Sequence, residues 1–265
     1  QTLKLNCLDP SEWISECLKP FASTIQMSAT LDPIDNHLKL IGLSNLESTI
    51  AIGHAPWRSN AYSIAIDTRV DTRYKNRSQY YETTAHTITT LYQESNGQPI
   101  AIFFPSYHYA NTIKTYIETI DSSLPIYIQE KNLSLNEQKD FIENSIDHQA
   151  ILFLVLGSAF TEGIDTLGGQ IQTAMVVSPA LPEVNPLNEM KLQHEKLNDS
   201  SKAFQKTYII PAFQKIHQAL GRLVRAPEHS AKILLHGKRF LQPEYREILA
   251  GEYQTETVIR KSSEL

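Results

Sequence analysis

The chain of 265 residues is 41% hydrophobic and 20% charged, which is typical of a globular protein with one large domain or two small ones. Its net charge of -5 argues against indiscriminate binding to nucleic acid. The charge is uneven, because 130–200 holds eleven Asp or Glu and four Lys, whereas 202–246 holds nine Lys or Arg and two Glu. A basic C-terminal third is compatible with a polyanion site and equally with solvated surface.

The two cysteines, Cys7 and Cys17, are too few for a disulfide framework and indicate a reducing compartment. No apolar run approaches the ~20 residues that span a bilayer, and no signal-peptide pattern opens the chain. We therefore expect a cytoplasmic protein without membrane contact, associated with the nucleoid if it is bacterial. The start at Gln1, within a half-apolar segment, suggests a piece of a longer protein. The nine histidines show no metal-ligand spacing, so we expect no metal site.

Short runs of β-branched and aromatic residues alternate with longer segments of helical period. The runs predict strands at 24–28, 62–67, 100–104, 151–156, 173–177 and 232–235. Apolar residues at helical spacing predict helices around 81–91 and 109–120. Several strands are apolar throughout, as in parallel sheets that are covered on both faces. The sequence therefore predicts a three-layer α/β fold with a mostly parallel sheet.

One long polar segment, from about 183 to 206, contains no clear strand. Its Leu187, Met190 and Leu197 are compatible with a loosely docked helix or with a mobile excursion.

The segment 211–225 predicts an amphipathic helix with a cationic face. Gln218, Arg222 and Arg225 fall within a sector roughly 60° wide, opposite Phe213, Ile216, Leu220 and Leu223. Guanidinium groups, which are planar and always charged, suit phosphate. An ordinary amphipathic helix with a wet basic face is the alternative. Gly221 favours the phosphate site, because a glycine inside a helix costs roughly 1 kcal/mol and permits close approach.

Two further patches follow predicted strands. After 100–104, Ser106 is a candidate helix N-cap and Tyr107 follows it. After 151–156 comes a glycine-punctuated turn, G-S-A-F-T-E-G-I-D-T-L-G-G, whose amides and hydroxyl suit phosphate and whose carboxylates suit ribose. Because ligands of open α/β sheets gather beyond the carboxyl ends of the strands, we expect all three patches at that edge.

In this order the patches resemble the motifs of the XPD and DinG class of superfamily 2 DNA helicases. A-I-F-F-P-S-Y resembles motif IV, L-G-S-A-F-T-E-G-I-D motif V, Q-A-L-G-R-L-V-R motif VI, and S-A-T-L motif III. The resemblance runs from about residue 21 to residue 249 and covers the C-terminal motor half of such enzymes. One departure is that members often carry Asp before the basic-Arg-Phe run, whereas His236 and Gly237 stand here.

The resemblance implies a lead-in with the motif III segment over 1–32 and a RecA-like second helicase domain over 33–265. Family enzymes bind ATP between two such domains. The implied catalytic residues are Arg222 and Arg225, as arginine fingers, and Gln218. The implied nucleotide-binding residues are Glu162, Gly163, Asp165 and Gly221. The implied DNA contacts are Ser106, Tyr107 and Thr161. The implied residues that couple hydrolysis to DNA binding are Ser28 and Thr30.

The phosphate loop G-x-x-x-x-G-K-S/T and the acidic Mg²⁺ motif are absent from this sequence and belong to the first half of the family enzymes. ATP and Mg²⁺ are therefore expected to be held mainly by the N-terminal motor domain, with any iron-sulfur cluster also upstream. We expect this chain to be inactive alone, with single-stranded or forked DNA as partner and 5′ to 3′ movement.

Two alternatives stay open at this point. The chain is compatible with a nucleic-acid-binding or regulatory module that has lost motor activity. It is also compatible with an unrelated nucleotide-binding α/β enzyme that shares only a Gly-rich turn and an Arg-bearing helix.

Overall fold

The computed structural model describes residues 3, 5–28, 30–53, 55–158 and 167–265. The chain forms two compact units. Unit 1 comprises Gln1–His54 and Pro182–Pro211, and unit 2 comprises Ala55–Leu181 and Ala212–Leu265.

Unit 2 is built on a seven-stranded sheet with the order β3-β4-β2-β5-β6-β1-β7. The strands are β1 (Tyr62–Asp67), β2 (Ile100–Phe104), β3 (Ile126–Ile128), β4 (Ile151–Val155), β5 (Thr173–Val176), β6 (Ala231–His236) and β7 (Val258–Ile259). All six neighbouring pairs are parallel, as predicted from their apolar sequences.

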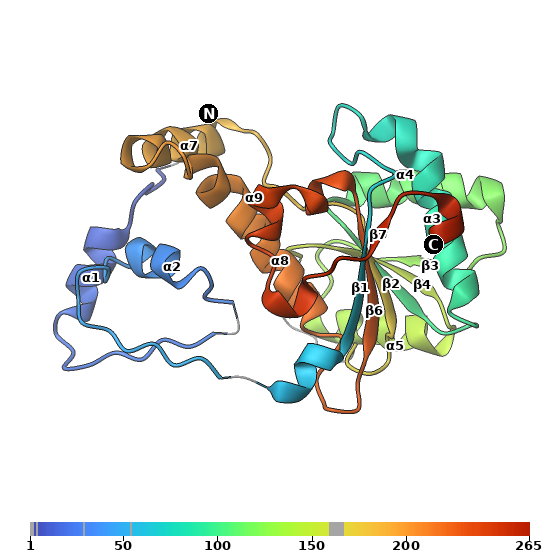
Figure 1. Cartoon of the computed structure of the whole chain (residues 1–265), viewed down its shortest axis with the longest axis horizontal. Coiled ribbons are helices and arrows are strands. Elements are labelled where there is room, and N and C mark those ends of the chain that lie inside the picture. Colours follow the sequence, from blue (N-terminus) through green and yellow to red (C-terminus); the bar gives the residue numbers. More distant parts are fainter. Residues whose placement is uncertain (1–2, 4, 29, 54, 159–166) are drawn as a thin grey trace. The chain divides into compact units, whose positions relative to one another are not determined.

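Helices cover the sheet on both faces. They are α3 (Tyr81–Glu94), α4 (Tyr107–Ile120), α5 (Leu135–Asp147), α8 (Ile210–Leu220) and α9 (Pro243–Arg246), with short turns η1 (Pro56–Asn60), η2 (Arg77–Tyr80), η4 (Lys238–Leu241), η5 (Gly251–Tyr253) and η6 (Ser262–Glu264). Figure 1 shows α3 and α4 together on one side of the sheet and α5 on the other. Alternate residues of β2, namely Ile100, Ile102 and Phe104, pack in one core with α3 and α4. The predicted three-layer, RecA-like α/β fold is confirmed.

Five of the six predicted strands are present within a residue or two of their predicted ends. The strand predicted at 24–28 is wrong, because the described residues there form no ladder and Ile25 and Met27 are exposed. Two strands escaped prediction, β3 and β7. They are only three and two residues long, and both sit at the sheet edges.

Unit 1 contains α1 (Ser11–Leu18), α2 (Ile34–Leu40), α7 (Pro186–Asn198) and the π-helical turn η3 (Gln205–Ile209). The polar segment therefore forms a helix, which the Asn185 side chain caps by accepting from Asn188 N–H at 2.9 Å. Glu195 of this helix pairs with Lys39 and Lys206 at 4.0 and 3.8 Å. The domain boundary at residue 32 stays a prediction. No helix in the described ranges is long and apolar enough to cross a membrane.

Candidate functional site

The helix in segment 211–225 ends before Arg222 and Arg225. Helix α8 ends at Leu220, and Gly221–Leu223 form a turn in which Arg222 N–H donates to Ala219 O and Leu223 N–H to Leu220 O. The prediction of a helix through residue 225 was therefore wrong in its last turn. A glycine inside a helix costs roughly 1 kcal/mol against Ala, and Leu223 is fully buried in the core. Gln218 thus lies on the helix, whereas Arg222 and Arg225 lie beyond it.

This turn meets a glycine pair that precedes β5. Gly169 N–H donates to Leu223 O at 3.1 Å, and Gly169 has a φ of +73° that favours glycine. A Cβ on Gly168 would come within 2.9 Å of Arg225 Cγ and 3.5 Å of Arg222 O. The end of the glycine-punctuated segment and the arginine turn are therefore in van der Waals contact.

The arginine turn lies at the amino ends of β5 and β6, because the turn precedes β6 and the glycine pair that it contacts precedes β5. The expectation that all three patches share the carboxyl edge was wrong for this one. The rule that ligands of open α/β sheets bind beyond the carboxyl ends of the strands concerns loops that follow a strand. This turn follows a helix and precedes a strand, so the rule does not apply to it.

The end of α8 is fixed by residues that sequence reasoning missed. Arg58 Nη2 donates to Tyr62 Oη at 2.9 Å and to Glu252 Oε1 at 3.0 Å, and it would lie 3.7 Å from a Cβ on Gly221. On α8, His217 stacks on Tyr253 with ring centroids 5.6 Å apart. A Cβ on Gly221 would therefore make only an ordinary van der Waals contact with Arg58, and its tight contact would be with His217 O at 2.9 Å.

A second corner lies at the carboxyl ends of β2, β3 and β4. Ser106 caps α4, because its hydroxyl accepts from Tyr109 N–H at 3.3 Å, as predicted. Tyr107 Oη accepts from Gln129 Nε2 at 2.8 Å. The buried Gln129 also accepts, through Oε1, from Val155 N–H at 2.9 Å and from the Ser158 hydroxyl at 3.1 Å.

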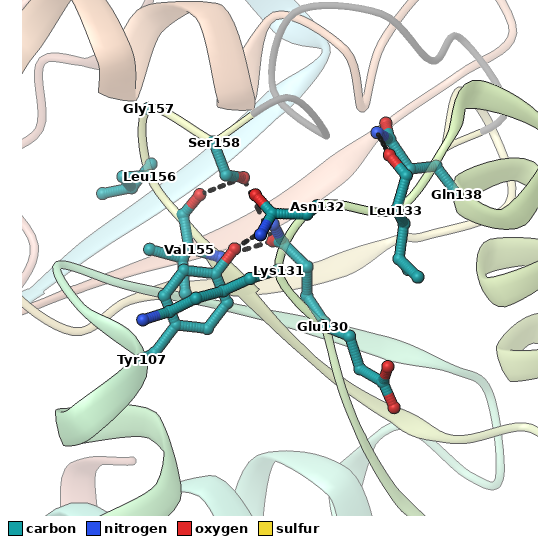
Figure 2. A pocket seen from close by; sticks show the side chains of 11 residues that line it. Tyr107, Glu130, Lys131, Asn132, Leu133, Gln138, Val155, Leu156, Gly157 and Ser158 are labelled. Atoms are coloured by element: carbon teal, nitrogen blue, oxygen red, sulfur yellow. Dashed lines mark hydrogen bonds between the residues drawn. The ribbon is translucent and has the colours of Figure 1, made fainter.

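A pocket of about 350 Å³ is lined by residues that include Tyr107, Gln129, Val155 and Ser158. Figure 2 shows Tyr107, Val155 and Ser158 around it. Lys131 Nζ lies 5.0 Å from the centroid of the Tyr107 ring, and burial raises the pKa of Tyr107, which therefore stays a neutral donor. The lysine and the phenol at one opening can donate to phosphate oxygens. Gln129 and Lys131 follow the short β3, and no motif in the sequence marked them.

Four of the predicted site residues, Thr161, Glu162, Gly163 and Asp165, lie outside the described residues. On the near side of that gap, Gly157 has a φ of +75°, and a Cβ there would meet Lys215 Cε of α8 at 2.7 Å. The predicted coupling residues lie in unit 1, where Thr30 N–H donates to Ser28 Oγ at 3.2 Å.

The departure from the family pattern after the arginine turn lies at a conformationally constrained glycine. Gly237 has a φ of +141°, and a Cβ there would come within 2.9 Å of Thr72 Oγ1. A carboxylate beside Lys238 comes from the loop after β1, where Asp71 Oδ2 lies 3.0 Å from Lys238 Nζ. Arg239 donates to the Ser178 hydroxyl at 2.9 Å.

The described residues contain no cluster of three or more His, Cys, Asp or Glu that could hold a metal ion.

Comparison with known proteins assigns this fold and these motifs to a family. The helicase C-terminal domain family matches residues 88–256, which is more than half of the chain, and the chain belongs to this family. This membership excludes the hypothesis of an unrelated α/β enzyme that shares only two short motifs.

Similar proteins include two curated DNA helicases. The ATP-dependent DNA helicase chl1 of Schizosaccharomyces pombe is 22% identical over 90% of this chain and 31% of its own length. The ATP-dependent DNA helicase XPD of Sulfolobus acidocaldarius is 23% identical over 82% of this chain and 39% of its own. A solved XPD helicase structure superposes with a TM-score of 0.72 at 20% identity, over 91% of this chain and 43% of that one. The predicted resemblance to XPD-class helicases is confirmed, and the chain spans about a third of these relatives' length.

Proposed function

We propose that this chain is the second RecA-like motor domain of an ATP-dependent DNA helicase or translocase. In this proposal ATP lies between this domain and the N-terminal motor domain of the same protein. Arg222 and Arg225 reach the γ-phosphate as arginine fingers, and Gln218 orients that phosphate or the attacking water. Arginine fingers stabilise charge that develops in phosphoryl transfer and contribute about 10³ to 10⁵ in rate.

The observation that carries the proposal is the packing of Gly168 and Gly169 against the arginine turn. It couples the motif that would contact the nucleotide through Glu162, Gly163 and Asp165 to the motif that would supply the fingers. A shift of either segment by a few tenths of an ångström would move the other, since close-packed groups transmit displacement.

In the same proposal Ser106, Tyr107 and Thr161 contact single-stranded or forked DNA. The first two lie at the carboxyl edge of the sheet, whereas the arginine turn lies at the amino edge. DNA and nucleotide would then use opposite edges of one rigid sheet. Ser28 and Thr30 would link hydrolysis to DNA grip, and movement would run 5′ to 3′, as the family resemblance implies.

The N-terminal motor domain would hold Mg²⁺ and most of the triphosphate, and any iron-sulfur cluster would lie there or upstream. Arg222 and Arg225 fit the ATP phosphates as cations at a glycine-lined corner. The chain alone would then neither hydrolyse ATP nor unwind DNA at a significant rate. Residues 33–265 would form the motor domain with 1–32 as its lead-in, in a cytoplasmic enzyme.

The test is ATPase activity stimulated by single-stranded DNA, measured for the full-length protein, for its Arg222→Ala variant and for this chain alone. We expect an active parent, a loss of about 10³-fold or more in Arg222→Ala with DNA binding retained, and a silent fragment. Arg260→Ala, at an exposed arginine after β7, is the matched control and should keep parental activity. An active fragment would refute the split site.

A full-length protein that binds DNA without hydrolysing ATP would instead identify a module that has lost its motor.

A further inference from the structure

A second cationic region lies at the carboxyl ends of β1 and β6, on the same edge of the sheet as the corner at β2, β3 and β4 but at different strands. It comprises Arg73, Tyr74 and Arg77 from the loop after β1, and Lys238 and Arg239 from the turn after β6. We call these five residues the basic surface.

The charges of the basic surface converge on one buried carboxylate. Asp71, only 2% exposed, accepts from Arg73 Nε at 2.9 Å and from Asn76 Nδ2 at 2.7 Å, with Lys238 Nζ at 3.0 Å. These contacts, that from Arg73 foremost, hold the pKa of Asp71 far below its usual range. The Arg73 and Lys238 side chains are nevertheless 49% and 45% exposed. Asp71 therefore lies beside two cations at the surface, and its single negative charge can neutralise only one of them.

Arg239 adds a third cation, which is half-buried. Burial foremost lowers its pKa, Tyr245 and Asp71 act in the opposite direction, and the neighbouring Arg73 adds to the lowering. Its Nη2 is bonded to the Ser178 hydroxyl, which is neutral, and its Nε is buried without a partner among the described residues. Because a desolvated guanidinium gains from contact with an anion, this position favours a negatively charged ligand.

The aromatic member of the basic surface suits a nucleotide. Tyr74 is 81% exposed, with the Arg77 guanidinium 4.8 Å from its ring centroid. The same guanidinium lies 4.6 Å from the ring centroid of Tyr109, in the first turn of α4. Ser106 and Tyr107 lie at the start of the same helix, so the basic surface and the proposed DNA contact both adjoin the N-terminal end of α4.

We propose that the basic surface is an additional binding site for single-stranded nucleic acid, in which Arg73, Lys238 and Arg239 take a backbone phosphate and Tyr74 stacks a base. Exposed aromatic rings beside cations are the means by which proteins hold single strands without reading their sequence. The site rests on the proposed function, because it extends the strand held at Ser106 and Tyr107. It requires no ATP hydrolysis.

The test is fluorescence anisotropy of a labelled oligothymidylate with the full-length protein, without ATP, at salt concentrations from about 50 to 200 mM. Lys238→Gln should lower the magnitude of the salt slope by about 0.7, the share of one phosphate contact on a single strand. Tyr74→Ala should weaken binding about fivefold or more. Lys238→Arg and Tyr74→Phe should bind like the parent, because each keeps the charge or the ring.

Lys232→Gln is the matched control, since Lys232 is an exposed lysine near the amino end of the same strand, β6. Equal salt slopes and affinities for the parent, Lys238→Gln and Tyr74→Ala would overturn the proposal, as would a parent that does not bind the oligonucleotide. Tyr74→Ala keeps the test decisive if Lys238→Gln misfolds, because Tyr74 lies outside the core.

Replacing chloride by inorganic phosphate at constant ionic strength separates the two sources of phosphate. A nucleic-acid site predicts that the difference between parent and Lys238→Gln persists, whereas its disappearance would identify a site for free phosphate and overturn the proposal. The ATPase test of Arg222→Ala fails or succeeds separately. Failure of the motor assignment is thus distinguishable from failure of this site.

Discussion

Gly168 lies against Arg225 so closely that a Cβ at position 168 would come within 2.9 Å of the Arg225 Cγ. The contact involves the stem of the arginine, close to its own backbone, so rotation of the distal guanidinium alone does not relieve it. The position of Arg225 therefore depends on the lack of a side chain at Gly168.

Replacing Gly168 with Ala should lower ATP turnover of the full-length protein with little effect on single-strand binding, because the added methyl displaces Arg225. Overpacking of this kind costs typically 1–3 kcal/mol, which a thermal melt would detect. Gly251→Ala is the control, since a Cβ there meets nothing within 4 Å. Equal turnover in both variants would contradict the assigned role of Arg225.

Ser106→Asp should separate helix capping from DNA contact. Aspartate is as good an N-cap as serine, so the urea midpoint should hold, whereas a carboxylate facing a phosphate should weaken oligonucleotide binding severalfold. Asn185→Asp makes the same change of charge at the N-cap of α7 and should leave binding unchanged. Parental affinity in Ser106→Asp would remove Ser106 from the DNA contact.

Asp67→Ala should destabilise the fold by about 3–5 kcal/mol, the range for removing one partner of a buried ion pair. The fully buried Asp67 accepts from Arg69 Nη2 at 2.7 Å and from His236 Nδ1 at 2.7 Å, and Thr84 Oγ1 lies 3.0 Å from the other nitrogen of that histidine. Glu256→Ala, at an exposed partner of Arg246, should cost at most about 1 kcal/mol. Urea unfolding measures both, and losses of similar size would contradict this account.

His217 should make stability fall in mild acid. Burial lowers its pKa to about 4 from an ordinary value of 6.5, so the unfolded chain takes up a proton that the folded chain excludes. The stability that the neutral ring contributes is full above pH 6.5 and declines towards pH 4, by at most about 1.4 kcal/mol per pH unit.

His217→Gln should flatten part of this decline, because it keeps an acceptor for Ala250 N–H but cannot titrate. The rest of the decline should remain, because burial also lowers the pKa of His236. Urea unfolding at a series of pH values checks the change, and an unaltered slope between pH 6.5 and 4 would contradict it.

The central sheet was predictable because the apolar composition of its strands indicates that they are buried. All five residues of β2 and of β4 are apolar and buried, which only a covered parallel sheet explains. The segment 24–28, T-I-Q-M-S, instead alternates polar and apolar residues, and a strand of that kind needs a neighbour that composition does not reveal.

The site was only partly predictable. The arginines and Ser106 belong to contiguous motifs, whereas Arg58 and Glu252 meet across 194 positions and neither lies in a motif. The end of α8 at Leu220 depends on Gly221 together with the burial of Leu223, a competition between helix continuation and core packing that periodicity alone does not resolve.

The sheet order also constrains how the chain acquires its structure during synthesis. Strand β1 pairs with β6 on one side and β7 on the other, and its last residue, Asp67, contacts His236 across 169 positions. A chain leaving the ribosome N-terminus first carries β1 with both hydrogen-bonding edges empty until β6, which begins at Ala231, has emerged. Such non-local pairing folds slowly and exposes an apolar edge meanwhile. A truncated chain that ends before residue 231 would leave β1 free to pair with another nascent copy. We therefore expect such a truncation to cause aggregation as well as loss of activity.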